Sequence, residues 1–153
     1  MSQLSERIKQ TKFEGAGQEA MLSIMIASSY LRERLNTICT RQGISLQQFN
    51  ILRILKGAYP NGYPRSEISH RMVERAPDTT RLVDRLVKAG FVRREKSPDD
   101  LRQSIAKITD PGIKLLIRLS EEIKNFHENL EEKLTKETCQ DISNGCEEIL
   151  KLK

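Results

Sequence analysis

The sequence predicts a mainly α-helical protein with one small β-hairpin. Three patterns support this fold class. Apolar residues recur every three or four positions over most of the chain, turn-forming residues separate these stretches, and the period changes to alternation between residues 91 and 108. With 153 residues, of which 37% are hydrophobic, the chain has about the length of one domain and enough apolar side chains for a buried core.

The N-terminal part, residues 1–43, is expected to be helical. Residues 3–12 have the pattern of a short helix, which two glycines then interrupt. A longer amphipathic helix is expected from about Gln18 to Gly43, with a coiled-coil-like seam formed by Met21, Ile24, Leu31, Leu35 and Ile38. We expect this segment to supply the first dimerisation helix.

The middle part, residues 44–108, is expected to contain three helices and then the hairpin. Ser45 and Gln48 have the spacing of a capping box, which predicts the start of a helix. The Pro/Gly-rich stretch 57–64 ends this helix, and a short helix follows over residues 65–72.

The last helix of the middle part is expected to have Pro77 in its first turn, because the fixed φ of proline suits that position. Either Ala76 or Asp78 caps this helix. Its buried face is expected to contain Leu82 and Leu86, with Val83 as a further candidate. The two strands of the hairpin are predicted over 91–96 and 103–108, joined by Ser97, Pro98, Asp99 and Asp100.

The C-terminal part, residues 109–153, is expected to form two helices capped by Thr109 and Thr135, the first with Pro111 in its first turn. The first helix carries the apolar stripe Leu116, Leu119, Ile123, Phe126 and Leu130, and the second carries Cys139, Ile142, Cys146, Ile149 and Leu152. We expect the stripe at 116–130 and the seam at 21–38 to form a dimer interface, since a small neighbouring domain offers little surface to cover them. The alternative is that both belong to the core of a monomer.

The order helix, helix, short helix, helix and hairpin is that of a winged helix-turn-helix. In such a unit one helix fits the major groove of DNA, and a basic hairpin reaches the adjacent minor groove. The charge distribution agrees, because residues 65–107 carry 11 Lys/Arg against 7 Asp/Glu, whereas residues 108–153 carry 7 against 10. Ordinary variation of surface charge is the alternative explanation.

Three segments of the chain resemble the MarR family of bacterial transcription regulators. They are GISLQQFNILRIL (residues 43–55), TRLVDRLVKAGFV (residues 80–92), and DLR (residues 100–102) followed by ITDPG (residues 108–112). The resemblance extends over about residues 18–150. It implies a homodimer with interlocked N- and C-terminal helices and two winged domains on a palindromic DNA operator. It also implies that a small-molecule effector or thiol oxidation shifts the DNA-competent population.

The resemblance also suggests which side chains meet double-stranded DNA. Thr80, Arg81 and Arg85 match major-groove positions, Arg102 matches a wing-tip arginine that enters the minor groove, and Asp100 matches the aspartate that positions it by a salt bridge. Residues 73–75 (VER) depart from the family, in which a Gly-containing turn and a polar cap are common at this place. With Thr79 at the start of the recognition helix, Arg94 on the hairpin and Ser66 added to these, the expected DNA-binding residues are Ser66, Thr79, Thr80, Arg81, Arg85, Arg94, Asp100 and Arg102.

Each of these residues also has a purely structural explanation. Arg81 and Arg85 form a solvated helix face if they pair with Asp78 and Asp84. Asp100 and Arg102 can be a pair that stabilises the turn, and the hydroxyls of Thr79 and Thr80 can bond the backbone at the start of a helix.

Enzymatic and metal chemistry find no support in the sequence. His70 and His127 lie far apart in the sequence, so we expect no metal site. No Gly-rich phosphate loop or metalloprotease motif is present, so we expect no cofactor and no enzymatic activity. Cys39, Cys139 and Cys146 are expected to be buried structural thiols. Cys139 and Cys146 lie about 10 Å apart along a helix at ~1.5 Å per residue, too far for a disulfide within one chain. Cys39 lies at the end of the first long helix, and not near the N-terminus, where the peroxide-sensing branch of the family that the chain resembles keeps its reactive thiol, so a redox-sensing regulator is the less favoured alternative.

The remaining expectations concern location and partners. An odd number of cysteines and the lack of a secretory signal or membrane span favour a cytoplasmic protein. An effector pocket is expected between the dimerisation helices and the DNA-binding part, lined by apolar side chains. The alternative function is a winged-helix or helical adaptor that binds other proteins and has no operator.

Overall fold

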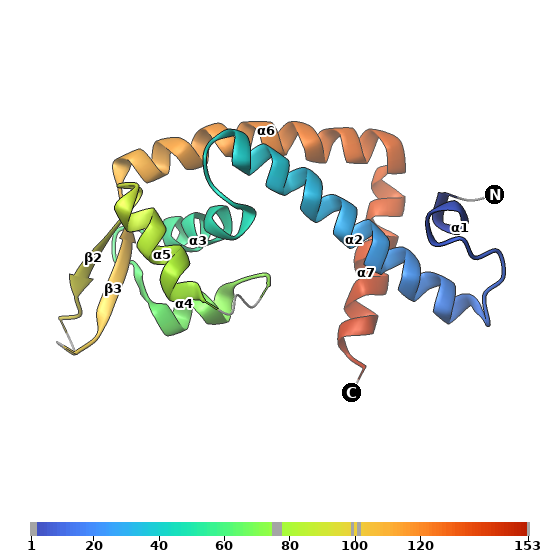
Figure 1. The fold of residues 1–153 in the computed structure, drawn as a ribbon, viewed down its shortest axis with the longest axis horizontal. Coiled ribbons are helices and arrows are strands. Elements are labelled where there is room, and N and C mark those ends of the chain that lie inside the picture. Colours follow the sequence, from blue (N-terminus) through green and yellow to red (C-terminus); the bar gives the residue numbers. More distant parts are fainter. Residues whose placement is uncertain (1–2, 75–77, 99, 101, 153) are drawn as a thin grey trace.

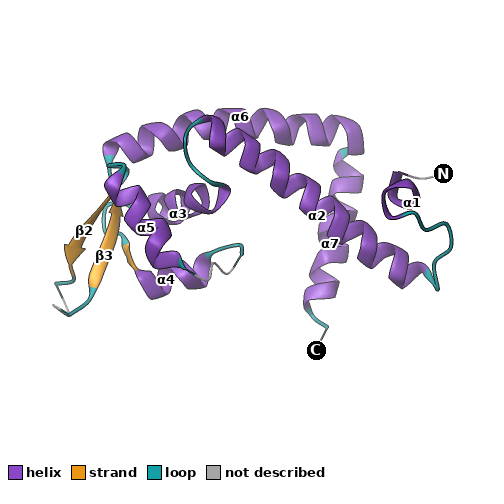
Figure 2. Cartoon of the chain, viewed as in Figure 1, coloured by secondary structure: helices purple, strands orange, loops and turns teal. Residues whose placement is uncertain are grey.

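The computed structural model describes residues 3–74, 78–98, 100 and 102–152 and confirms a mainly helical fold with a small sheet. Figures 1 and 2 show that α3, α4, α5 and the hairpin gather at one end, while α1, the first half of α2 and α7 lie at the other. The elements are α1 (Gln3–Ile8), α2 (Ala16–Arg41), α3 (Leu46–Gly57), β1 (Tyr63–Pro64), α4 (Arg65–Arg71), α5 (Thr79–Lys88), β2 (Val92–Lys96), β3 (Ser104–Ile108), α6 (Asp110–Leu134) and α7 (Lys136–Leu150).

Local side-chain hydrogen bonds explain where three of these helices begin. Ser45 accepts a hydrogen bond from the backbone N–H of Gln48, and the Gln48 side chain accepts one from the backbone N–H of Ser45, so the predicted capping box is confirmed. Thr109 caps α6 ahead of Pro111, and Thr135 caps α7, as predicted. None of the helices in the described part of the chain has the length and hydrophobicity needed to span a bilayer.

The start of α5 is fixed by one of the two caps that the sequence offers. Asp78 is its N-cap, and its carboxylate accepts a hydrogen bond from the backbone N–H of Arg81 at 3.0 Å. The helix begins at Thr79, and the predictions for Ala76 and Pro77 lie outside the described residues. Val83 and Leu86 form the buried face of α5, whereas Leu82 is only half-buried.

The sheet contains one strand more than the sequence predicts. β2 and β3 pair in antiparallel fashion from Val92–Ile108 to Lys96–Ser104, as expected of the hairpin. β1 joins the other edge of β3, with Tyr63 opposite Ala106. The sequence did not indicate β1 because two residues are too few to show an alternating pattern, and because proline is found mainly in edge strands. β1 is recognisable only through its pairing with β3.

The hydrophobic core includes the first half of α6. Leu115, Leu116, Leu119 and Ile123 are buried in one cluster with residues of α3, α5 and the sheet. The prediction that the stripe at 116–130 forms a dimer interface is therefore wrong for its N-terminal half. α6 is long enough to cover the helix-turn-helix part before it extends beyond it, where Phe126 and Leu130 are only half-buried.

A close approach of α6 to the segment before β2 generates a test of this packing. A Cβ atom at Gly112 would lie 2.3 Å from the backbone oxygen of Phe91, which also accepts a hydrogen bond from the backbone N–H of Thr109. Gly112→Ala should therefore lower the free energy of unfolding by about 1–3 kcal/mol in urea denaturation, the usual cost of overpacking. Gly57→Ala is the matched control, since nothing lies within 4 Å of its Cβ position, and its stability should change by less than about 1 kcal/mol. Equal stabilities of the two variants would contradict the packing.

Candidate nucleic-acid interface

The exposed face of α5 is polar and mostly basic. Val83 and Leu86 anchor the helix in the core, which leaves Arg81, Asp84, Arg85 and Lys88 on the surface. α5 packs against α3, α4 and β2, so its orientation is fixed by three neighbouring elements. The result is a rigid helix that presents cations to the solvent.

Thr79 does not belong to this surface, which corrects the prediction that it contacts DNA. The residue is only 5% exposed, and its hydroxyl lies 3.9 Å from the sulfur of Met72. Thr79 is the first residue of α5 and turns inward to the end of α4. The neighbouring Thr80 is half-buried and lines a recess described below.

Both arginines of α5 lie on the exposed face, which the DNA-contact prediction and the solvated-face alternative both require. The Arg81 side chain is 81% exposed and forms an ion pair of 2.8 Å with Asp78. Exposed ion pairs of this kind stabilise a protein by about 1 kcal/mol or less, so an anionic ligand can replace the Asp78 carboxylate as the partner of the Arg81 guanidinium. Arg85 is exposed as well, and no ion pair involves it among the residues that the structure describes.

A recess of about 360 Å³ brings together predicted residues from separate elements. Ser66 of α4, Thr80 of α5, Arg94 of β2 and Arg102 beside β3 all line it, and Arg65 adds another cation. Four polar or charged groups that the chain separates by up to 36 positions thus face one concave surface. Guanidinium and hydroxyl groups in this arrangement are suited to bind phosphate oxygens.

Asp84 forms a contact that the sequence did not reveal. Its carboxylate pairs with Arg94 of β2 at 2.7 Å, and not with the arginines of its own helix. Helical spacing suggests only local partners for Asp84, whereas the observed partner comes from the next element. The pair ties the hairpin to α5.

The hairpin tip differs in one respect from the expectation. The Asp100 carboxylate accepts a hydrogen bond of 2.9 Å from the backbone N–H of Arg102, and no ion pair between their side chains exists in the described part of the chain. The expected salt bridge is thus replaced by a bond to the backbone. The backbone N–H of Gln103 in turn donates to the Asp100 carbonyl oxygen at 2.9 Å, so Asp100 closes the turn on both sides.

The three cysteines differ in burial. Cys39 is fully buried, and burial, with the nearby Glu122 carboxylate adding to it, raises the pKa of its thiol to about 11. Its reactive thiolate is therefore scarce at neutral pH. Cys139 and Cys146 are only half-buried within the chain, contrary to the expectation of buried thiols, because α7 buries none of its residues. No group of three metal-binding side chains forms within the described residues.

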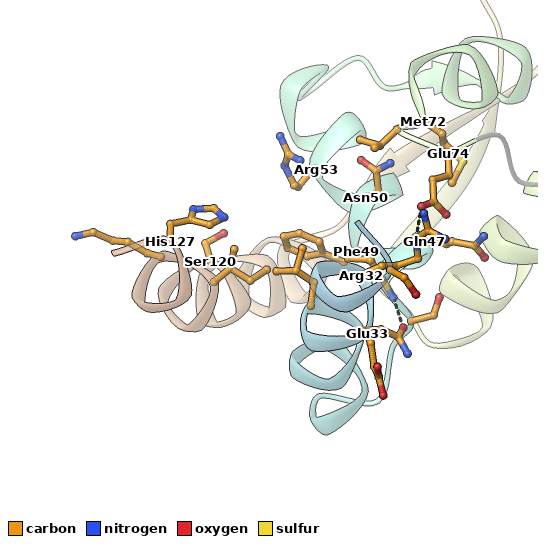
Figure 3. A pocket seen from close by; sticks show the side chains of 18 residues that line it. Arg32, Glu33, Gln47, Phe49, Asn50, Arg53, Met72, Glu74, Ser120 and His127 are labelled. Carbon is orange, nitrogen blue, oxygen red and sulfur yellow. Dashed lines mark hydrogen bonds and ion pairs between the residues drawn. The ribbon is translucent and has the colours of Figure 1, made fainter. Parts of the chain in front are cut away.

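A larger cavity of about 820 Å³ lies between α2, α3, α6 and the end of α4. Figure 3 shows side chains from these elements, with Phe49 near the centre of the view. Its lining is mixed, which corrects the expectation of an apolar pocket: Leu35, Leu46, Phe49, Met72, Val73 and Ile123 are accompanied by Arg32, Glu33, Arg53, Glu74, Lys124 and His127. The sequence did not indicate that these charged residues line one cavity, because they come from four separate segments.

The bond from Asp100 to the Arg102 backbone predicts how the hairpin tip responds to mutation. Asp100→Ala removes the acceptor, so the ¹⁵N order parameter of the Arg102 amide should fall from about 0.85 to below about 0.6. Asp100→Asn keeps an acceptor oxygen and should stay near the original value. An unchanged order parameter in the alanine variant would show that Asp100 does not hold the tip.

Comparisons with known proteins agree with this geometry. A family model described as the MarR family matches residues 44–104. The chain is similar to the HTH-type transcriptional regulator FarR of Neisseria gonorrhoeae, with 32% identity over 78% of this chain and 84% of the relative. It is also similar to the homoprotocatechuate degradative operon repressor of Escherichia coli, with 27% identity over 82% and 81% of the two chains. Among solved structures, a MarR transcription factor from Planctomyces limnophilus superposes with a TM-score of 0.68 at 32% identity, covering 89% of this chain and 98% of that one.

Proposed function

The chain belongs to the MarR family of transcription regulators, and on that premise we propose that it binds a palindromic DNA operator as a homodimer whose affinity a small molecule modulates. The observation that carries the proposal is the concave basic surface formed by α5, α4 and the hairpin. Its hydroxyls and guanidinium groups come from several elements and face the same side. The E. coli relative is named a repressor, which favours repression as the direction of control.

In this proposal α5 is the recognition helix. Arg81 and Arg85 reach base edges in the major groove, because both are exposed on the face opposite the core. Thr80 and the recess residues Ser66 and Arg94 bind the phosphate backbone and set the register of the helix. Arg102 enters the minor groove or contacts its phosphates.

The two ends of the chain supply the dimer interface. Within one chain, large apolar side chains stay exposed on α2 and α7; they are Met21, Ile24, Met25, Tyr30, Ile142, Ile149 and Leu150. A second copy that covers them removes this surface from water. We propose that residues 1–43, the second half of α6 and α7 intertwine with those of the partner, while residues 44–108 of each subunit bind one half-site. The twofold symmetry of such a dimer requires a palindrome.

The cavity of about 820 Å³ is the proposed effector site. It lies between α2, α6 and α3. α2 and α6 extend into the proposed dimer interface, whereas α3 packs against α4 and α5 of the proposed DNA-binding part. A ligand there contacts both parts, so it favours one relative arrangement over another and changes operator affinity.

Selection of binding sites from random DNA tests the DNA-binding proposal. The wild-type protein should select a twofold-symmetric sequence. Arg81→Ala should lose about 1–3 kcal/mol of binding free energy to that sequence and its preference at one position in each half-site, as expected when a bidentate base contact is removed. Arg118→Ala, at an exposed position of α6, is the control and should select the original sequence. An unchanged consensus for Arg81→Ala would exclude it as a base-reading residue, and no selection at all would favour the adaptor function.

The dimer proposal is tested on α7. Ile142→Glu should convert the dimer to a folded monomer, because α7 buries no residue within its own chain and the core does not need Ile142. Gln140→Glu adds the same charge at an exposed position outside the apolar stripe and should remain dimeric. Light scattering gives the mass, and circular dichroism shows whether the helices persist. A dimeric Ile142→Glu variant would contradict the assignment of this face.

A further inference from the structure

The turn between α3 and β1 contains one of the two Asn-Gly sequences of the chain. They are Asn61-Gly62 in this turn and Asn144-Gly145 within α7. Asparagine followed by glycine is especially prone to lose its side-chain amide, because glycine lacks the Cβ atom that would hinder attack of its backbone nitrogen on the asparagine side chain. The chain therefore offers the same chemistry in two different structural settings.

Packing against β3 fixes glycine at position 62. Its φ is +74°, in the left-handed region that favours glycine. A Cβ atom at this position would also collide with the backbone oxygen of Ala106 and with the Lys107 side chain. Because no other residue type fits here, the residue at position 61 is always followed by an unhindered backbone nitrogen.

The Asn61 side chain is exposed and does not hold the turn together. Its amide group takes part in none of the hydrogen bonds formed by the residues that the structure describes. The backbone N–H groups of Asn61 and Gly62 both donate to the Ala58 carbonyl oxygen, at 2.8 and 3.0 Å. One acceptor thus holds both donors, so a local opening of the turn releases the Gly62 nitrogen without unfolding α3.

The second Asn-Gly sequence lies inside a regular helix. α7 extends from Lys136 to Leu150, and the Asn144 side-chain oxygen accepts a hydrogen bond of 3.2 Å from Gln140. Attack by the Gly145 nitrogen would need a non-helical backbone at Asn144, and neighbouring helical hydrogen bonds break together with it. The helix therefore protects Asn144, whereas the turn leaves Asn61 open to attack.

We propose that Asn61 is a site of spontaneous deamidation, and that its conversion to isoaspartate weakens DNA binding. The Gly62 backbone nitrogen loses its proton to the solvent and bonds to Cγ of Asn61. The Cγ–Nδ2 bond breaks, and the side-chain nitrogen leaves as ammonia. Water then opens the five-membered imide ring. Attack of water at Cγ gives aspartate, whereas attack at the backbone carbonyl carbon gives isoaspartate, in which the chain continues through the side chain.

Isoaspartate adds one methylene group to the backbone directly before β1. Gly62 then loses its close approach to Ala106, and the pairing of Tyr63 with Ala106 is displaced. β1 continues directly into α4, whose residues Arg65 and Ser66 line the basic recess. The effect on DNA rests on the proposed function, whereas the chemistry at Asn61 is independent of it.

Mass spectrometry tests the chemistry. The full-length protein is incubated for days in mildly alkaline buffer and digested with trypsin, and a sample digested at the start gives the background. Peptide 57–65 (GAYPNGYPR) should exchange its amide for an acid at least about tenfold faster than peptide 137–151 (ETCQDISNGCEEILK), because the turn opens more easily than the helix. Asn61→Gln is the matched control and should stay unchanged, since glutamine would have to form a six-membered ring.

Binding to the DNA that the fresh protein selects tests the consequence. At full conversion to isoaspartate the affinity should fall about two- to tenfold, the loss expected when one hydrogen bond to DNA is removed. Asn61→Asp carries the new charge on an unchanged backbone and should bind within about twofold of the fresh wild type, as is usual for a surface substitution. Incubated Asn61→Gln should keep its affinity. Without DNA, amide hydrogen exchange over residues 63–71 should become faster in the incubated wild type only.

Two outcomes would overturn the inference. Conversion at Asn61 that is no faster than at Asn144 would show that the turn does not promote the reaction. Unchanged affinity of the converted wild type would show that β1 tolerates the longer backbone. If the fresh wild type selects no DNA, the proposed function fails instead. The peptide masses would then still decide whether Asn61 reacts, and hydrogen exchange would decide whether the product loosens α4.

Discussion

Burial of α3 is the constraint on which the rest of the structure depends. Ile51, Leu52 and Leu55 are fully buried, and the helix packs against α2, α4, α5, α6 and β3. A buried aliphatic side chain contributes about 1.5–3 kcal/mol relative to an exposed one, so this helix holds several elements in place at once. The capping box at Ser45 fixes where this helix begins.

The basic surface and the large cavity lie around this same helix. α3 supports α5, whose outer face carries the cations, and it also contributes Phe49 and Arg53 to the cavity wall. A change in the cavity therefore occurs next to α3, which packs against α5. Because the core is closely packed, such a change displaces whole elements more readily than it deforms them. This arrangement places the proposed effector site and the proposed DNA-binding surface around one buried helix.

The sequence was sufficient for features that depend on neighbouring residues. The caps at Ser45, Thr109 and Thr135, the helical periodicity and the hairpin all follow from local patterns, and the structure confirms them. Features formed by distant segments were missed or misjudged. β1 exists only through β3, the burial of Leu119 depends on α3, and the inward turn of Thr79 depends on Met72. The mixed lining of the cavity likewise combines residues of four segments, so no local pattern indicates its charge.

The segregation of charge along the chain has a consequence for how the protein meets its target. Basic side chains predominate in residues 65–107 and acidic ones in residues 108–153, and Figure 1 places the hairpin and α7 at opposite ends of the molecule. Within each chain, α4, α5 and the hairpin therefore carry a net positive charge, whereas α6 and α7 carry a net negative one. The field of a polyanion attracts the first group of elements and repels the second before any contact forms, which favours encounters through the hairpin side. Productive collisions become more frequent than random tumbling allows, and added salt weakens this attraction over a Debye length of about 8–10 Å.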